Sequence, residues 1–227
     1  LKLGMVGGGQ GAFIGGVHRM AARLDGCFDL VAGAFSSDAA RAHASAAELG
    51  IDVDRSYADF NEMAKAEAAR SDGIDAVSIV TPNHLHGPIA EAFLAYDISV
   101  ICDKPMTATL AQAESLSAAA QASKGHFFLT HNYTGYPMIR QARQMVAEGA
   151  LGEIRIVEAN YLQDWLSEAP ADDNKQAKWR MDAAQSGGGA IGDIGTHAHN
   201  LACFVTGLRA TAVSATLSSN VAGRMVD

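Results

Sequence analysis

The sequence predicts an α/β protein with a doubly wound parallel sheet in residues 1–131. Two observations lead to this prediction. Short runs that are apolar throughout alternate with stretches of helical periodicity, as in parallel strands covered on both faces. Strands that alternate with helices in this way predict parallel βαβ units. The expected strands are residues 3–6, 28–35, 76–80, 98–102 and 127–130, and the expected helices are residues 12–24, 38–49, 57–70, 85–95 and 110–123.

The rhythm of the sequence changes after residue 131, so we predict a second α/β domain in residues 132–227. Its expected elements are a helix at 138–148, strands at 154–161 and 211–219, and a helix from the glycines at 187–189 to about residue 206. The segment 162–186 is long, polar and without regular periodicity, which indicates a functional or disordered loop.

Composition excludes several classes of protein. The chain has 227 residues, a net charge of −8 and no long run of like charge, so it lacks the basic surface of a nucleic-acid-binding protein. No apolar stretch approaches the ~20 residues of a membrane span, and residues 1–4 resemble a strand rather than a signal peptide. Cys27, Cys102 and Cys203 lie far apart in apolar runs, which indicates buried free thiols. We therefore expect a cytoplasmic protein with no membrane or nucleic-acid partner.

A glycine-rich loop after the first expected strand is the first candidate site. Its glycines allow the backbone to turn sharply and approach a pyrophosphate, and the following helix offers N–H groups and the positive end of its dipole. Gly7, Gly9 and Ala12 fit the dinucleotide fingerprint, whereas a longer loop would use Gly15 as its third glycine. A purely structural turn is the alternative. The predicted cofactor contacts here are Gly7, Gly9, Gln10, Gly11, Ala12, Phe13 and Ile14.

The end of the second expected strand bears on the choice between NAD and NADP. A carboxylate usually binds the adenine ribose hydroxyls at this position, but this chain has Ser36 and Ser37, followed by Asp38 and Arg41. Small hydroxyl residues and a nearby arginine would accommodate a 2′-phosphate. The sequence therefore favours NADP, although Asp38 leaves NAD open. Ser37 or Asp38 could instead cap the next helix.

Two further groups of residues suggest chemistry. Asp103 and Lys104 follow a central strand, at the end where ligands bind in open α/β sheets, although a surface ion pair is the alternative. Asp193 and His197 are four residues apart on one expected helix face. A carboxylate beside an imidazole suits general acid–base work near neutral pH. Asp193 could instead cap the helix, with His197 as a packing histidine.

Two pairs of histidines could suggest a metal site, His84 with His86 and His197 with His199. Residues two apart on a helix point away from each other, so neither pair is a natural chelate. We therefore expect no metal. His86 is expected to line the cofactor crevice instead.

Together these motifs resemble the Gfo/Idh/MocA family, the group of glucose–fructose oxidoreductase, inositol dehydrogenase and rhizopine catabolism. The matching segments, in the family's order and spacing, are the glycine-rich loop, Thr81-Pro82-Asn83-His84, Asp103-Lys104-Pro105 and the run from Gly187 to His197. The resemblance implies a Rossmann domain, an NAD(P) cofactor and hydride transfer with a CH–OH or ketone group of a sugar, cyclitol or related polyol. It also implies that the second domain has an open, mainly antiparallel sheet, which is truncated here and exposes an apolar face or edge. A homo-oligomer formed through this C-terminal sheet is a further implication.

The resemblance also implies roles for individual residues. Lys104 takes the place of the catalytic lysine, His197 accepts the proton, and Asp193 orients the imidazole or a substrate hydroxyl. Asp103 replaces the family's glutamate, and Thr134 stands where the family usually has arginine. Further implied cofactor residues are Thr81, Pro82, Asn83, His86, Asp103, Lys104 and Asn132. Implied substrate residues are Lys104, Tyr133, Trp165, Arg180, Asp193 and His197.

Several alternatives remain open from the sequence. An NAD-dependent glycoside hydrolase of the same fold is one, and a non-catalytic nucleotide-binding regulatory protein is another. The presence of both Lys104 and His197 argues against the regulatory protein, because simple binding needs neither. Tyr136 and Tyr161 could serve the substrate or merely anchor their segments.

Overall fold

The computed structural model describes residues 1–164, 166–168, 170, 174–219 and 221. The chain forms two compact units, Leu1–Thr130 and His131–Asp227. Within the described ranges, the structure contains no helix long and apolar enough to cross a membrane.

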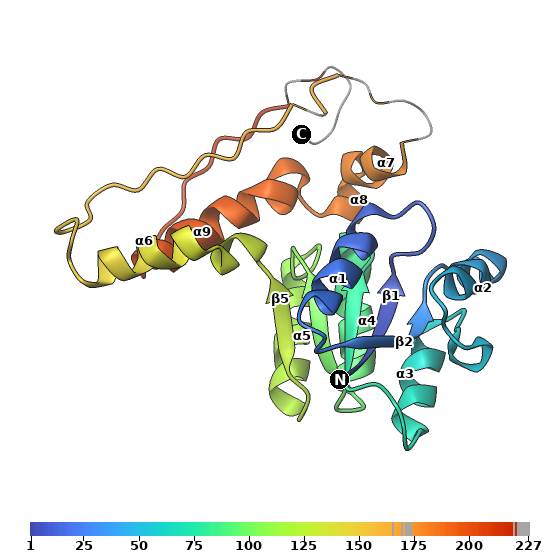
Figure 1. The fold of residues 1–227 in the computed structure, drawn as a ribbon. Helices are drawn as coiled ribbons and strands as arrows, with labels where there is room; N and C mark the ends of the chain where they lie inside the picture. Colours follow the sequence, from blue (N-terminus) through green and yellow to red (C-terminus); the bar gives the residue numbers. More distant parts are fainter. Residues whose placement is uncertain (165, 169, 171–173, 220, 222–227) are drawn as a thin grey trace. The chain divides into compact units, whose positions relative to one another are not determined.

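A parallel sheet forms the centre of the first unit, all of which the structure describes (Figure 1). Its five strands are β1 (Lys2–Gly7), β2 (Asp29–Ala34), β3 (Ala76–Val80), β4 (Ser99–Asp103) and β5 (Phe127–Thr130). They lie in the order β2-β1-β3-β4-β5, and every neighbouring pair is parallel. This arrangement confirms the predicted α/β fold with a doubly wound sheet. The central strand β3 is buried along its whole length, as its apolar sequence predicts.

The helices of the first unit begin where local capping signals occur. They are α1 (Phe13–Leu24), α2 (Ala39–Glu48), α3 (Phe60–Ala69), α4 (His86–Leu94) and α5 (Leu110–Ala122), with short 3-10 turns η1 (Val53–Arg55) and η2 (Asn83–Leu85). Side chains of Asp38, Asp59 and Thr109 accept hydrogen bonds from the first turns of α2, α3 and α5. The Asp59 cap explains why α3 begins three residues later than predicted.

The sheet is covered on both faces by apolar side chains. Met5 and Val6, neighbours on β1, point to opposite faces and belong to different apolar clusters. The larger cluster includes Phe93 of α4 and Leu116 of α5, which are fully buried. The smaller cluster includes Phe35, together with residues of α2.

The second unit is helical wherever regular structure occurs among its described residues. Its elements are η3 (Asn132–Gly135), α6 (Pro137–Ala147), α7 (Lys175–Met181), α8 (Ala183–Ser186), the π-helical turn η4 (Ile191–Gly195) and α9 (Thr196–Thr206). Helices α6 and α9 pack together, and the guanidinium of Arg143 lies 4.4 Å from the ring centroid of Phe204. The segment 162–186, which the sequence predicts to be a loop, contains the two short helices α7 and α8. Ala177 of α7 is buried, although the segment is otherwise polar.

The two strands predicted in the second unit, at residues 154–161 and 211–219, are not formed in the described part of that unit. Figure 1 shows both as extended segments. Ile156 is 84% exposed and Val213 is 86% exposed. Alternation of apolar and polar residues creates a face that a sheet could use, but a strand also needs a hydrogen-bonded neighbour. The apolar surface that we expected to be exposed is therefore present without a sheet.

The three cysteines are free thiols in different environments. Cys102 on β4 is fully buried, and burial, followed by the charge of Asp103, raises the pKa of its thiol. Cys203 is half-buried. Cys27 is exposed, contrary to the prediction, because it lies in the turn between α1 and β2.

Gly15 allows α1 to pack closely on the loop that follows β1, and its replacement tests that packing. A Cβ at Gly15 would lie 2.4 Å from the Cα of Gly8, whereas at Gly16 the nearest atom would be 3.9 Å away, on Arg19. We expect Gly15→Ala to lower the free energy of unfolding by about 1–3 kcal/mol, because the backbone must shift. Gly16→Ala is the control and should be neutral or stabilising by up to about 1 kcal/mol. Urea unfolding followed by circular dichroism measures both, and equal stabilities would contradict the close packing.

Candidate functional site

The carboxyl ends of the parallel strands bring the predicted residues of the first unit to one edge of the sheet. The glycine loop begins at Gly7 where β1 ends, Thr81 follows β3, and Lys104 follows β4. The strand order reverses between β1 and β3, and open α/β sheets bind ligands in the crevice at such a switch point.

The glycine loop turns sharply and packs against the elements around it. Gly7 and Gly8 have φ values of +81° and +73°, which favour glycine. A Cβ at Gly9 would lie 2.8 Å from the carbonyl oxygen of Phe35. Gly15 rather than Ala12 provides the close contact between helix and loop, so the structure favours the longer loop of the two alternatives.

The amino end of α1 is suited to an anion. Its N-cap residue, Ala12, provides no side-chain cap, and its first turn has no acidic residue, whereas α2, α3 and α5 are capped by side chains in this fully described unit. Helix α4 also lacks a side-chain cap, but it continues directly from the 3-10 turn η2. The first N–H groups of a helix have no partner within the helix, and its dipole is positive there. This uncapped end and the glycine turn fit a dinucleotide pyrophosphate. Gly11 and Phe13 are exposed beside it, and Ile14 is half-buried.

Gln10 of the same loop forms hydrogen bonds with residues of α2. Its backbone N–H donates to Ser45 Oγ at 3.1 Å, and its side-chain amide donates to the carboxylate of Glu48. The loop is also held by Arg19, which donates to the carbonyl oxygen of Gly8 at 2.7 Å. The glycine loop is therefore fixed from both α1 and α2.

The end of β2 confirms the capping interpretation of Asp38. Its carboxylate accepts a hydrogen bond from the backbone N–H of Arg41 at 2.8 Å, and its own N–H donates to Ser36 Oγ at 3.1 Å. Ser36 is half-buried, and the side chains of Ser37 and Arg41 are exposed. Asp38 and Ser36 thus serve the start of α2, and the exposed side chains near the end of β2 are those of Ser37 and of Arg41 in the first turn of α2.

The turn after β3 contains a buried hydroxyl that suits a polar ligand. Thr81 Oγ1 is buried and has no hydrogen-bond partner within the described ranges. A buried hydroxyl without a partner carries a desolvation cost that a ligand group could relieve. Pro82 is half-buried beside it, and Asn83 is buried at the start of η2.

Asp103 at the end of β4 is an anchor for neighbouring elements. Its carboxylate accepts a hydrogen bond from Thr130 Oγ1 at 2.9 Å and lies 3.9 Å from His18 Nε2. His18 also contacts Ser78 on β3, with Nδ1 2.9 Å from Oγ. Burial raises the pKa of Asp103, but His18, Thr130 and the charge of Lys104 together outweigh it and hold that pKa below its usual value. Lys104, the next residue, is half-buried.

His86, predicted to line the cofactor crevice, lies inside the protein. It is 1% exposed, with Nδ1 2.7 Å from the carbonyl oxygen of Pro105 and Nε2 2.9 Å from that of Thr81. The ring therefore connects the turn after β3 with the segment after β4.

In the second unit, the structure surrounds His197 with aromatic rings. His197 is 8% exposed, and its ring centroid lies 4.8 Å from that of Tyr133 and 6.1 Å from that of Tyr161. The two tyrosine hydroxyls are 2.6 Å apart, and their hydrogen bond, followed by burial, raises the pKa of Tyr133 to about 12. The sequence alone did not decide the role of Tyr161, because Tyr161 lies 28 positions after Tyr133 and no local motif connects the two.

Asp193 has a partner that the sequence did not predict. Arg180 Nε donates to Asp193 Oδ2 at 3.0 Å, and the Arg180 guanidinium lies 4.2 Å from the ring centroid of Trp179. Asp193 lies in the π-helical turn η4 rather than in regular α-helix, so the assumed helical spacing to His197 does not hold through this segment.

The remaining predicted residues have simple placements. Asn132 is exposed on η3. Thr134, which replaces the family's usual arginine, donates through Oγ1 to the carbonyl oxygen of His131 at 2.8 Å. Trp165 lies outside the described residues. Within the described ranges, the structure holds no group of three or more His, Cys, Asp or Glu side chains that could bind a metal ion.

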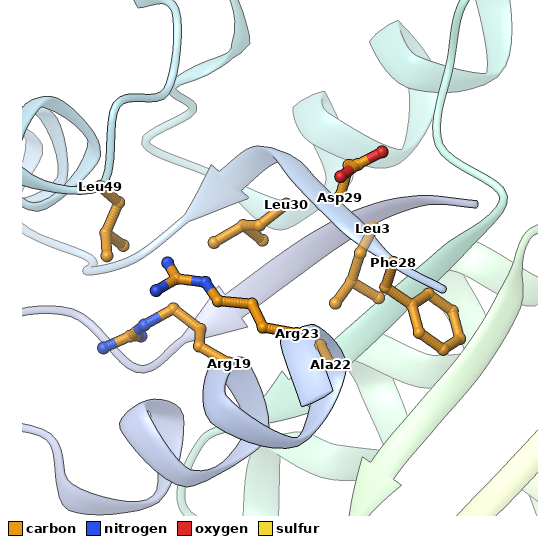
Figure 2. Close-up of a pocket in the computed structure, with 8 residues that line it drawn as sticks. All are labelled: Leu3, Arg19, Ala22, Arg23, Phe28, Asp29, Leu30 and Leu49. Atoms are coloured by element: carbon orange, nitrogen blue, oxygen red, sulfur yellow. The ribbon is translucent and has the colours of Figure 1, made fainter. Parts of the chain in front are cut away.

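A pocket of the first unit lies elsewhere (Figure 2). It is lined by Leu3, Arg19, Ala22, Arg23, Phe28, Asp29, Leu30 and Leu49. Asp29 and Leu30 begin β2, so the pocket lies near the amino ends of the strands. None of the predicted site residues lines it, and we do not assign it to the cofactor.

A glycine loop at an uncapped helix, beside the switch point of a doubly wound parallel sheet, is typical of a nucleotide-binding unit. Residues 1–144 match the oxidoreductase family with an NAD-binding Rossmann fold, and residues 139–227 match the GFO/IDH/MocA C-terminal domain. The chain therefore belongs to the GFO/IDH/MocA oxidoreductase family, as the resemblance of its motifs predicted.

Similar proteins include a named dehydrogenase and two solved oxidoreductase structures. Levoglucosan dehydrogenase of Pseudarthrobacter phenanthrenivorans is 32% identical over 96% of this chain and 54% of its own length. An oxidoreductase structure from Sinorhizobium meliloti has a TM-score of 0.87 and 52% identity, covering 100% of this chain and 58% of that one. An inositol dehydrogenase homologue from Azotobacter vinelandii, complexed with NADH and myo-inositol, has a TM-score of 0.83 and 40% identity, covering 91% and 52%. The chain spans about half the length of these proteins.

The charge of Asp103 should stabilise the fold in a pH-dependent way. Its folded-state pKa is lowered, so the stabilisation is present above the unfolded-state value of about 3.9 and is lost as pH falls through the folded-state pKa. We expect Asp103→Asn to lower the free energy of unfolding by about 1–3 kcal/mol near neutral pH. The difference from wild type should shrink as the solution is acidified below about pH 4.

Thermal unfolding of both proteins across the pH range measures this difference. Asp52→Asn is the control, because the Asp52 carboxylate is exposed and forms no side-chain cap on η1. A deficit for Asp103→Asn that stays constant from neutral to strongly acidic pH would rule out a stabilising role for the charge.

Proposed function

We propose that the protein is an NAD(P)-dependent oxidoreductase that transfers a hydride between its cofactor and a CH–OH or ketone group of a sugar, cyclitol or related polyol. The observation that carries this proposal is Lys104, which directly follows the anchored Asp103 at the carboxyl end of β4 in an NAD-binding Rossmann unit. The names of the similar proteins, which include a levoglucosan dehydrogenase and a homologue complexed with NADH and myo-inositol, support a polyhydroxylated substrate.

The cofactor, when bound, accepts or supplies the hydride. We propose that the uncapped end of α1 and the glycine loop bind its pyrophosphate, and that Thr81 offers its buried hydroxyl on the nicotinamide side. Asp103 and His86 would not contact the cofactor but would hold the loops at the strand ends in place through hydrogen bonds within the protein. The proposed cofactor-binding residues are Gly7, Gly9, Gln10, Gly11, Ala12, Phe13, Ile14, Ser36, Ser37, Arg41, Thr81, Pro82, Asn83, Lys104 and Asn132. Asp103 and His86, which the sequence also predicted as cofactor residues, are proposed to support them without touching the cofactor.

Proton and charge handling are assigned to three residues. In the direction of oxidation, His197 accepts the hydroxyl proton of the substrate, and in reduction it returns that proton. The Lys104 ammonium donates hydrogen bonds to the reacting oxygen and stabilises the negative charge that develops on it. Asp193, held by Arg180, orients a substrate hydroxyl or the imidazole.

The second unit provides the proposed substrate contacts. Tyrosine hydroxyls are protonated at physiological pH, and one of the two donates in the Tyr133–Tyr161 hydrogen bond, so the other keeps its proton for a hydrogen bond to the substrate. The Tyr133 and Tyr161 rings beside His197 offer an apolar wall with polar tips, which suits a polyhydroxylated ring. The proposed substrate-binding residues are Lys104, Tyr133, Trp165, Arg180, Asp193 and His197.

Replacement of the proposed catalytic residues should separate chemistry from cofactor binding. With a panel of polyols and sugars, followed by NAD(P)H absorbance, we expect Lys104→Ala to lower kcat by about 10²–10³-fold. His197→Gln should lower it by about 10²–10⁴-fold. NAD(P)H affinity, measured by fluorescence titration, should change no more than a few-fold in His197→Gln, because His197 is not among the proposed cofactor contacts.

Lys124→Ala is the control, because its side chain is 90% exposed. Normal NAD(P)H binding with no turnover by wild type, or with equal turnover by Lys104→Ala, would contradict the proposed reaction and favour a regulatory protein. Release of an aglycone with the cofactor retained would favour a glycoside hydrolase.

We propose further that NADP is preferred to NAD. Ser36 and Ser37 follow β2, the exposed Arg41 lies in the first turn of α2, and Asp38 is used as the cap of that helix. Arg41→Ala should raise KM for NADP⁺ by roughly 10–100-fold, the loss expected for a charged hydrogen-bond donor, and leave KM for NAD⁺ unchanged. The helix cap is retained because Asp38 binds the backbone N–H of residue 41.

Steady-state kinetics with each cofactor provide the measurement. Arg23→Ala, which removes another exposed arginine of the first unit, should leave both KM values unchanged. A wild type that uses NAD⁺ more efficiently than NADP⁺, or an equal effect of Arg41→Ala on the two, would overturn the preference.

We also propose a homo-oligomer formed through the second unit, because residues 154–161 and 211–219 expose large apolar side chains there. The free thiols of all three cysteines support a cytoplasmic location.

A further inference from the structure

The His86 imidazole, on the first residue of α4, is placed between two loops that leave neighbouring strands. One acceptor, the carbonyl oxygen of Thr81, belongs to the turn after β3, and the other, that of Pro105, lies one residue beyond Lys104. With 1% of its surface exposed and each ring nitrogen within 2.9 Å of a carbonyl oxygen, the ring has no face for a ligand. The geometry therefore concerns the loops and not direct contact with cofactor or substrate.

The protonation of His86 decides how many of these hydrogen bonds can exist at once. A neutral imidazole has one N–H donor, whereas the imidazolium has two. Burial lowers the pKa of His86, and the charge of Lys104 acts in the same direction. The Pro105 and Thr81 carbonyls and the charge of Asp103 act in the opposite direction without reversing the net effect. Burial thus opposes the charged ring, while the two carbonyl oxygens at 2.7 and 2.9 Å favour it, because a neutral ring would donate to one carbonyl and turn a bare nitrogen toward the oxygen of the other.

The carbonyls that His86 contacts lie within a residue of groups that the proposed reaction needs. The Pro105 carbonyl follows Lys104 directly, and the Thr81 carbonyl belongs to the residue whose buried hydroxyl lacks a partner in the described part of the chain. A misplacement of about 1 Å in a reacting group can cost about 10²-fold in rate, even when its cause lies outside the reacting groups. A small movement of either loop would therefore lower the catalytic rate.

We propose that His86 is a positioning residue that holds the Thr81 turn and the Lys104–Pro105 segment in fixed relation at the edge of the sheet. For its effect on turnover, this inference rests on the proposed function, in which Lys104 acts on the substrate. Its structural part, the connection of two loops through one ring, does not depend on that function.

Hydrogen–deuterium exchange of the protein without substrate tests the structural part. We expect His86→Ala to speed exchange in peptides that cover residues 81–84 and 104–109, and to change other peptides of the first unit much less. Phe93→Leu is the matched control, because Phe93 is a fully buried core residue on the same helix. It should speed exchange broadly through lost stability, without favouring those two segments.

Kinetics test the functional part. We expect His86→Ala to lower kcat by about 10²-fold and to change the cofactor KM no more than a few-fold. Added imidazole should restore part of kcat by occupying the space left by the ring. Phe93→Leu should keep kcat near that of wild type. If His86→Ala does not fold, His86→Gln serves instead, because its amide can still donate to one carbonyl.

The outcomes separate this inference from the proposed function. Absence of turnover by wild type would refute the proposed function, and exchange would still decide whether His86 holds the two loops. Exchange that rises evenly across the first unit in His86→Ala would overturn the positioning role. An equal loss of kcat in Phe93→Leu, or no recovery with imidazole, would also overturn it.

Discussion

Parallel pairing of β3 with β1 and β4 is the constraint on which the rest of the first unit depends. In this register Gly7 lies opposite Val80, and Ile79 lies opposite Cys102, so the three strands end at the same edge. Three segments therefore leave the sheet side by side at this edge. They are the glycine loop after β1, the Thr81 turn after β3 and the segment that begins with Lys104 after β4. The crevice at the reversal of strand order lies between the first two of these segments.

The polar residues at this edge belong to two groups with different tasks. Asp103 and His86 form hydrogen bonds within the protein and hold the ends of several elements. The amino end of α1 and the hydroxyl of Thr81 lack such protein partners in this fully described unit. Anchored groups reduce the reorganisation that a reaction requires, and groups without protein partners offer binding to a ligand. This edge of the sheet thus combines side chains that are fixed by internal hydrogen bonds with N–H and hydroxyl groups that can bind a ligand.

In the second unit, side chains around His197 are anchored by packing and hydrogen bonds in a similar way. Its ring is nearly buried against Tyr133 and Tyr161, whose hydroxyls bind each other, so its orientation is restricted by packing. Asp193 is fixed by Arg180 at 3.0 Å, and both side chains are mostly buried. A half-buried carboxylate needs such a partner, because its desolvation would otherwise be costly. The motif around residue 193 therefore includes an arginine that is distant from it along the chain.

The sequence by itself determined what depends on neighbouring residues along the chain. The apolar runs predicted the five strands of the first unit, the glycine loop predicted the turn after β1, and the Asp38 cap was among the stated alternatives. Only the tertiary structure decided the His18–Asp103 contact, the two carbonyl partners of His86 and the Tyr133–Tyr161 pair, because each joins segments that share no local pattern. The strands expected at 154–161 and 211–219 failed for a related reason. Backbone preference is local, but a strand also requires a partner, and packing rather than alternation provides one.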